Sequence, residues 1–392
     1  MKKAFAFGDK SIESAVRRVN EIRRVAVIGA GIMGQGIIED LLKKTGYEIV
    51  VLDVSTDALE RCKAVFDSMW KRQISTFQIR KQDAEALTAR VVYTQNYADL
   101  DGADIIWEVA AERGDVKKAI FAAIEKNVDA DRLAAVFSNT SSHTTAELAC
   151  LFSSDAFREK FLTVHGYFPF TVNRLIDVMK GKYASNETFA FGVVFADQIL
   201  EKSVIALPID HHGYIADPLF QAMGAIISWD IRSSRDIIEL GGLWDLFTAN
   251  PFNVLDQTGH MPYTESSRHL GDALPANDRL RNLYLRDGKY YPDWIAKLEK
   301  DGSTGVASKG RRGFFAWSNG SRPKPEKVLD PASGEYVELS EISRKEFWSY
   351  YEAAELDRCA GKIKSAESLV HVACADDAGG RAFRRYAVPL CL

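Results

Sequence analysis

Three glycines that follow a short apolar run constrain this chain of 392 residues more than any other feature. The run covers residues 25–28, and the glycines are Gly29, Gly31 and Gly34. Apolar residues then recur at helical spacing as far as Leu42, so the segment predicts a strand, a tight turn and a helix. Gly29 permits the turn, Gly31 lets a phosphate approach the backbone, and Gly34 lets the helix pack closely on the strand. Free N–H groups at the helix N-terminus complete a site for a dinucleotide pyrophosphate.

The next apolar run ends in a carboxylate that favours one dinucleotide. Asp53 closes residues 47–53 and lies 19 positions after Gly34, where an acidic residue is expected to accept hydrogen bonds from the adenosine ribose. A carboxylate there would repel a 2′-phosphate, so we expect NAD rather than NADP as the cofactor. The plainer interpretation is a strand-end Asp that caps the following helix. The residues predicted to bind the cofactor at this turn are Gly29, Gly31, Ile32, Met33, Gly34 and Asp53.

Composition excludes several classes of protein. Hydrophobic residues make up 46% of the chain and charged residues 27%, which is typical of a globular protein with two or three domains. The net charge is −4 and the basic residues are scattered, so nucleic acid is not an expected partner. The five cysteines lack metal-ligand spacing, which predicts reduced thiols and no metal site. We see no signal peptide and no apolar run of about 18 residues, so we expect no membrane span and a cytoplasmic location.

Strands and helices alternate from Arg24 onward, and this order predicts an α/β fold. We expect a Rossmann-type, mostly parallel sheet with helices on both faces to occupy residues 1–210. Residues from about 56 to 89 read as a helical projection, whose basic side chains either face solvent or grip a phosphorylated substrate. Later apolar residues recur at helical spacing, which predicts an all-α domain over 211–320 and a helical C-terminal extension over 321–392.

Candidate catalytic side chains follow the strands after the nucleotide turn. Oxidation of an alcohol by hydride removal requires a base for the hydroxyl proton, and ligands of open α/β sheets lie at the carboxyl ends of strands. Glu108 and Glu112 follow one predicted strand, residues 138–142 follow the next, and His165 ends a third. The ordinary pKa of histidine, about 6.5, makes His165 the best candidate base, with Asp177 as a carboxylate that could orient it. A lone histidine at a strand end is also compatible with a structural role.

Seven motifs in order resemble the L-3-hydroxyacyl-CoA dehydrogenase family. They are GAGIMGQG (29–36), WEVAAE (107–112), SNTSS (138–142), HGYFP (165–169), DHHGY (210–214), PFNVLD (251–256) and GRRGFF (310–315). The resemblance implies that a 3-hydroxyacyl-CoA is oxidised to the 3-ketoacyl-CoA with NAD. It also implies a helical domain that shapes the substrate cleft and a homodimer contact.

The resemblance assigns roles to individual residues by their position in these motifs. His165 matches the general base, and Ser141 matches the serine that hydrogen-bonds the reacting oxygen. Three further positions match residues that contact the nucleotide in the family: Glu112, Lys117 and Asn139.

Three departures from the family pattern affect the substrate site. Asp177 stands where the family has a glutamate, and Phe168 replaces an asparagine beside the nicotinamide. Asp217 and Pro218 replace an Asn-Arg pair, so an ionised Asp217 would repel a thioester or a developing enolate. It must be protonated, turned away or facing a cationic substrate group. One of His211 and His212 could pair with Asp217, and the plainer interpretation is a pair of surface histidines. We therefore expect an unusual acyl group that is aromatic, branched or polar.

Three hypotheses for the function follow from these residues. The first is a 3-hydroxyacyl-CoA dehydrogenase in which His165, Asp177, Ser141 and Asp217 form the catalytic group. The second is a relative that oxidises a free hydroxy acid, such as a sugar acid or a carnitine-like compound. The third is a non-catalytic NAD-binding subunit of a larger complex.

Overall fold

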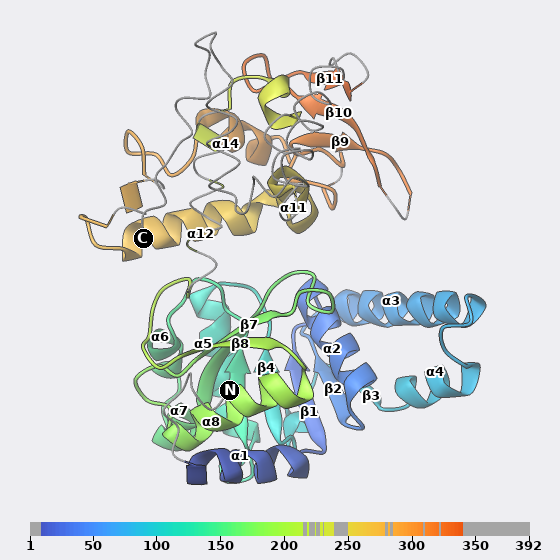
Figure 1. Cartoon of the computed structure of the whole chain (residues 1–392), viewed down its shortest axis with the longest axis vertical. Helices are drawn as coiled ribbons and strands as arrows, with labels where there is room; N and C mark the ends of the chain where they lie inside the picture. The colour runs from blue at the N-terminus through green and yellow to red at the C-terminus, as the bar shows by residue number, and fades with distance from the viewer. Residues whose placement is uncertain are drawn as a thin grey trace, which may run out of the picture. The chain divides into compact units, whose positions relative to one another are not determined.

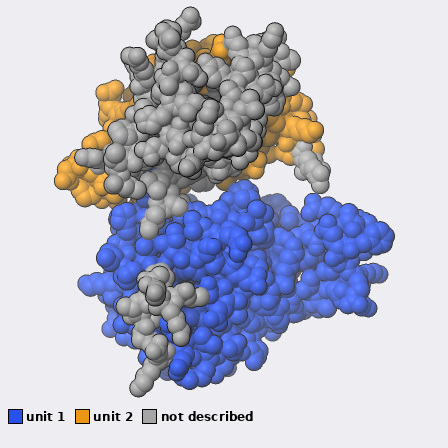
Figure 2. Space-filling view, in the orientation of Figure 1, with its two compact units in different colours: residues 1–219 blue, residues 220–392 orange. Residues whose placement is uncertain are grey.

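The computed structural model describes two compact units, residues 1–219 and 220–392 (Figure 2). The residues described are 9–214, 218, 224, 228–229, 231–238, 250–278, 281–282, 285–308, 310–320 and 323–339. We expected the first domain to end at residue 210, but the first unit continues beyond it. Tyr214 is buried in this unit, and its hydroxyl donates a hydrogen bond to the Thr140 carbonyl oxygen. No helix among the residues described is long and apolar enough to cross a membrane.

An eight-stranded sheet forms the centre of the first unit (Figure 1). The strand order is β3-β2-β1-β4-β5-β6-β7-β8, and neighbours pair in parallel except β6 with β7. The strands are β1 (Arg24–Ile28), β2 (Glu48–Leu52), β3 (Val91–Thr94), β4 (Ile105–Glu108), β5 (Ala135–Ser138), β6 (Phe161–Gly166), β7 (Leu175–Met179) and β8 (Ser203–Leu207). The predicted mostly parallel sheet is confirmed.

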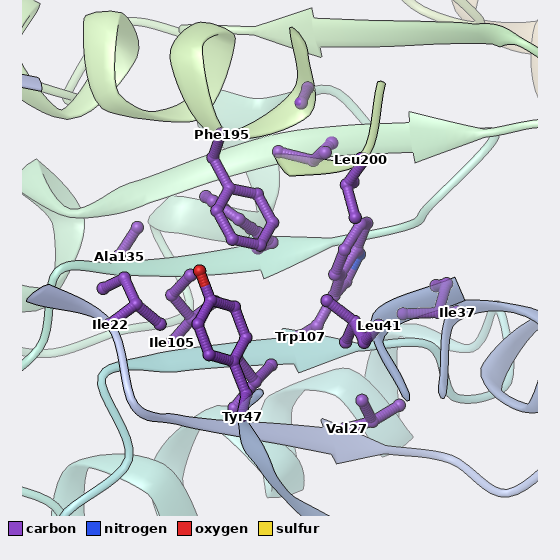
Figure 3. Packing of buried hydrophobic residues seen from close by; sticks show 14 of the residues in the cluster. Ile22, Val27, Ile37, Leu41, Tyr47, Ile105, Trp107, Ala135, Phe195 and Leu200 are labelled. Carbon is purple, nitrogen blue, oxygen red and sulfur yellow. The ribbon is translucent and has the colours of Figure 1, made fainter. Parts of the chain in front are cut away.

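Helices cover both faces of this sheet because its central strands are apolar on both sides. In β1, Val25 and Val27 join one core with α1, α2, α3 and α8, whereas Ala26 and Ile28 join another with α5, α6 and α7. Figure 3 shows the first core, where the Trp107 ring meets Phe195. The helices are α1 (Asp9–Glu21), α2 (Ile32–Lys44), α3 (Thr56–Ser75), α4 (Lys81–Thr88), η1 (Tyr97–Leu100), α5 (Gly114–Asn127), α6 (Thr145–Ala149), α7 (Asp155–Glu159), α8 (Asn186–Val194) and the π-helical turn η2 (Phe195–Ile199).

The described part of the second unit combines helices with a small sheet. Its elements are α11 (Pro251–Thr258), α12 (His260–Ala273), α14 (Asp293–Lys300), β9 (Phe315–Trp317), β10 (Pro325–Leu329) and β11 (Tyr336–Glu338). The strands form an antiparallel sheet in the order β11-β10-β9. The buried Asp256 carboxylate accepts hydrogen bonds from the backbone N–H groups of Phe314 and Phe315 and from the Trp317 indole. This carboxylate therefore ties α11 to the start of the sheet.

The small sheet changes our expectation for the end of the chain. We expected an all-α domain followed by a helical extension over 321–392, but β10 and β11 lie in that extension. The reason is local, since Pro325 starts β10 and the buried Val328 and Leu329 add to the core of the second unit. Residues 340–392, which include the apolar positions on which the helical expectation depended, lie outside the described residues.

Candidate active site

The glycine turn after β1 has the geometry that the sequence predicts. Gly29 has φ +116°, and a Cβ there would lie 2.6 Å from the Val109 carbonyl oxygen. A Cβ on Gly34 would lie 2.0 Å from the Gly29 oxygen, so α2 packs too close to the turn for any side chain. No atom lies within 4 Å of a Cβ built on Gly31, the N-cap residue of α2. The turn thus leaves space for a ligand at the N–H groups of the first turn of α2.

Asp53 lies beside this turn. Its Oδ2 accepts a hydrogen bond from the Ala30 N–H and its Oδ1 accepts one from the Ser55 N–H, both at 2.9 Å. Ser55, not Asp53, is the N-cap residue of α3, so the simple capping interpretation does not account for the carboxylate. On the same turn, Ile32 is 56% exposed and Met33 is half-buried. Two apolar side chains, an anion-binding helix end and a ribose-type carboxylate fit a bound dinucleotide.

A buried ion-pair network lies at the end of β4. The Lys117 ammonium lies 2.9 and 3.0 Å from the two Glu108 oxygens and 3.5 Å from Glu112. Glu108 also accepts hydrogen bonds from the Ser138 hydroxyl and the Ala110 N–H. Burial disfavours the ammonium form, but the two carboxylates outweigh burial and raise the pKa of Lys117. Lys117 was predicted to contact the nucleotide, yet it is only 1% exposed and faces these carboxylates.

The polar loop after β5 is held by the same network. Glu112 accepts hydrogen bonds from the Thr140 hydroxyl and the Ser141 N–H, both at 2.9 Å. The Asn139 side-chain oxygen accepts a hydrogen bond from the Gly166 N–H, which joins this loop to the end of β6. Within the described ranges the Ser141 hydroxyl forms no hydrogen bond, so it can bind a ligand. Glu112 and Asn139, which we predicted to contact the nucleotide, thus position the loop in this structure.

His165 and Asp177 form a buried pair across two strands. They lie directly opposite each other in the antiparallel pairing of β6 with β7. His165 is 6% exposed and Asp177 is fully buried. Burial disfavours the imidazolium and lowers the pKa of His165 to about 3, so the imidazole is neutral at neutral pH. The structure therefore places together the two residues that the sequence predicts as base and orienting carboxylate.

Two tyrosines surround the imidazole of His165. The Tyr167 ring meets it edge to face at a centroid distance of 4.7 Å, and the Tyr214 ring lies 5.2 Å away. The Tyr167 hydroxyl donates a hydrogen bond of 2.5 Å to Asp177 Oδ2. Sequence reasoning assigned neither tyrosine to the His165 pair. The available signal for Tyr167 was its spacing of two residues from His165, which favours the same face of an extended chain.

Four of the residues that the sequence singles out remain: Phe168, His211, His212 and Asp217. Phe168 is half-buried and precedes Pro169 through a cis peptide bond. Asp217 lies outside the described residues, so the alternative in which it pairs with His211 or His212 stays a hypothesis. The Nδ1 atom of His212 lies 3.3 Å from the Ser142 carbonyl oxygen, whereas His211 is exposed.

The nucleotide turn and the buried imidazole follow β1 and β6, strands of one direction that end at the same edge of the sheet. This arrangement is that of an NAD-dependent oxidoreductase. Residues 24–210 match the model of the 3-hydroxyacyl-CoA dehydrogenase NAD-binding domain. Residues 24–210, just under half of the chain, thus form an NAD-binding domain of this family, and the cofactor is NAD.

Solved structures share the fold at low sequence identity. FadB2 of M. tuberculosis is 21% identical to this chain, with a TM-score of 0.61. The match covers 76% of this chain and 99% of FadB2. (S)-3-Hydroxybutyryl-CoA dehydrogenase PaaH1 of Ralstonia eutropha is 24% identical with a TM-score of 0.61, covering 76% of this chain and 100% of its own. An NAD-dependent 5-formyl-3-hydroxy-2-methylpyridine 4-carboxylic acid 5-dehydrogenase is 21% identical to this chain, with a TM-score of 0.51. The match covers 76% of this chain and 91% of that enzyme.

Proposed function

We propose that this protein reversibly oxidises a 3-hydroxyacyl-CoA to the 3-ketoacyl-CoA, with an unusual acyl specificity. One observation carries the proposal. His165 and Asp177 are buried opposite each other at the carboxyl edge of the sheet, and the glycine turn after β1 lies at the same edge. A neutral imidazole beside a carboxylate is suited to accept the proton of an alcohol. Family membership of residues 24–210 supports the same chemistry.

Each residue has a role that follows from its surroundings. His165 takes the hydroxyl proton at a ring nitrogen, and Asp177 stabilises the imidazolium that forms. Bound NAD supplies the acceptor for the hydride that leaves C3. The Ser141 hydroxyl is suited to donate a hydrogen bond to the reacting oxygen in the keto form. Gly31 and Asp53 hold the pyrophosphate and ribose, and the low exposure of His165 keeps water from the imidazole.

The acyl specificity is proposed from aromatic side chains near the base. Tyr167 and Phe168 follow His165 and offer ring surface that a small aliphatic chain would not fill. Asp217 adds a preference for a polar or cationic acyl group. We also propose a homodimer formed through the second unit, which sedimentation at several concentrations would test.

A panel of substrates tests the proposed function directly. The full chain is mixed with NADH and 3-ketoacyl-CoA esters of short, branched and aromatic acyl groups, and the absorbance of NADH is followed. We expect oxidation of NADH with at least one ester, with the fastest rate on an aromatic or branched group. No reaction on any ester, together with intact NAD binding, would overturn the proposal and favour a non-catalytic NAD-binding subunit.

Oxidation of a free hydroxy acid is the second candidate. A protein of the same fold, the NAD-dependent 5-formyl-3-hydroxy-2-methylpyridine 4-carboxylic acid 5-dehydrogenase, is named for a pyridine carboxylic acid. The same panel therefore includes free 3-keto acids and the corresponding hydroxy acids with NAD. A kcat/KM that is higher for a free acid than for its CoA ester would favour this candidate.

A further inference from the structure

We infer that Tyr167 is a positioning residue that keeps Asp177 ionised and correctly oriented for proton transfer at His165. This inference rests on the proposed function, because it concerns the base of that reaction. It gives a role to Tyr167, a residue of the HGYFP motif to which the resemblance assigns none.

The backbone brings the three side chains together. His165 and Asp177 are directly opposed across β6 and β7, and Tyr167 lies two residues after His165. The neighbouring positions Val164, Ile176 and Val178 point into the core on the other face of the sheet. His165 and Asp177 therefore share the face away from that core, and the Tyr167 hydroxyl reaches Asp177 Oδ2 at 2.5 Å.

The chemistry of this contact determines the charge of the carboxylate. Asp177 is fully buried, and burial alone favours the neutral carboxylic acid. A hydrogen bond donated to the carboxylate favours the ionised form, and a phenol is a strong donor. A neutral Asp177 would lose the charge that stabilises the imidazolium of His165. The Tyr167 hydroxyl therefore maintains the form of Asp177 that the base requires.

The Tyr167 ring also restricts the imidazole. Its edge-to-face contact with His165, at an interplanar angle of 83°, limits rotation of the His165 ring about χ2. Tyr167 is half-buried, so it spans from the buried carboxylate towards the surface of the unit. One side chain thus orients both partners of the pair.

Other titratable groups near this edge have partners of their own. The Tyr214 hydroxyl donates to the carbonyl oxygens of Thr140 and His143. Glu112 holds the loop after β5, and Asp210 accepts hydrogen bonds from the first N–H groups of α6. On the other side of β7, Asp177 pairs with Ile205 of β8, which carries no charge.

Tyr167→Phe tests the inference because it removes the hydroxyl and keeps the ring. We expect kcat/KM at pH 7 to fall roughly tenfold, mostly in kcat, and the acid limb of its pH profile to rise by about one pH unit. Tyr214→Phe is the matched control, since it removes a buried hydroxyl beside the same imidazole, and we expect its acid limb to stay in place. An acid limb that stays in place in Tyr167→Phe would overturn the inference.

A double-mutant cycle separates positioning from a direct role. If Tyr167 acts through Asp177, Tyr167→Phe should change kcat less than about twofold in an Asp177→Asn background. An equal loss in both backgrounds would overturn the inference and make Tyr167 a substrate contact. If Tyr167→Phe folds poorly, 3-fluorotyrosine at position 167 supplies a stronger donor, and the acid limb should then move to lower pH.

A measurement without substrate distinguishes this inference from the proposed function. The carbon-13 signal of the Asp177 carboxyl group reports its titration in the full chain. We expect its pKa to be about one unit higher in Tyr167→Phe than in the wild type. An unchanged Asp177 pKa would overturn the inference even in an active enzyme. A raised pKa in a protein that oxidises no hydroxyacyl-CoA would support the inference and reject the proposed function.

Discussion

The ammonium of Lys117 bridges both oxygens of Glu108, and both side chains are buried. This ion pair is a structural support of the site, because Glu108 in turn binds the Ser138 hydroxyl. Both Glu108 oxygens accept a hydrogen bond from Lys117, and Ser138 and Ala110 are further donors. Each buried charge is therefore stabilised by the other.

Removal of one partner of this pair should destabilise the first unit. Lys117→Met leaves the Glu108 carboxylate buried without its counter-charge, and we expect a loss of about 3–5 kcal/mol in the free energy of unfolding. Urea unfolding followed by circular dichroism measures it. The double variant Lys117→Met with Glu108→Gln serves as the control and should recover a large part of the loss. A cost below about 1 kcal/mol in the single variant would contradict the role of the pair.

Two neighbouring glycines should respond differently to alanine. Gly34→Ala forces a Cβ against the Gly29 oxygen, so we expect roughly 1–3 kcal/mol of destabilisation. A Cβ on Gly31 meets no protein atom, so Gly31→Ala should fold normally and weaken NAD binding about tenfold or more. Gly46→Ala, also without close neighbours, is the control for both effects. Calorimetric titration with NAD and thermal unfolding measure them, and a Gly31→Ala variant with normal NAD affinity would contradict the proposed phosphate approach.

Asp53 should determine the choice between NAD and NADP. Asp53→Asn keeps an acceptor for the Ala30 N–H but removes the negative charge that repels a 2′-phosphate. We expect the ratio of NAD to NADP affinity to fall about tenfold, through weaker NAD binding and stronger NADP binding. Fluorescence titration with NADH and NADPH measures the two affinities. Equal NADH and NADPH affinities in the wild type would rule out this role for the carboxylate.

The strands and the glycine turn were predictable because each depends on nearby residues. Apolar runs predict strands, and Gly29, Gly31 and Gly34 predict a turn, whatever the rest of the chain does. The helical projection expected from about residue 56 to 89 contains the helices α3 and α4. The candidate base was found in the same way, since His165 ends an apolar run.

The partners of these residues depend on long-range geometry that periodicity does not contain. The contact of Tyr167 with Asp177 requires the antiparallel register of β6 and β7, and a shift of one residue would separate them. The burial of Lys117 depends on which face of α5 meets the sheet. The strand β10 was missed because its five residues, which begin at Pro325, are too few to show the alternation of a strand.

Acid should destabilise the folded protein through His165. The pKa of His165 is about 3 in the folded state and about 6.5 in an unfolded chain, so neither state binds this proton above about pH 6.5. Below that pH the unfolded state takes up the proton first, and stability falls by about 1.4 kcal/mol per pH unit until about pH 3. His165→Gln should lack this component. Equal acid dependence of urea unfolding in wild type and variant would contradict a buried neutral imidazole.

The most direct test is the turnover of His165→Ala in the oxidation direction, with NAD and the 3-hydroxyacyl-CoA that corresponds to the best ester of the panel. Removal of a general base should lower kcat by roughly two to four powers of ten, while the Kd for NAD stays within about twofold of the wild-type value. Turnover close to that of the wild type would show that another group takes the proton, and would contradict the assignment of His165.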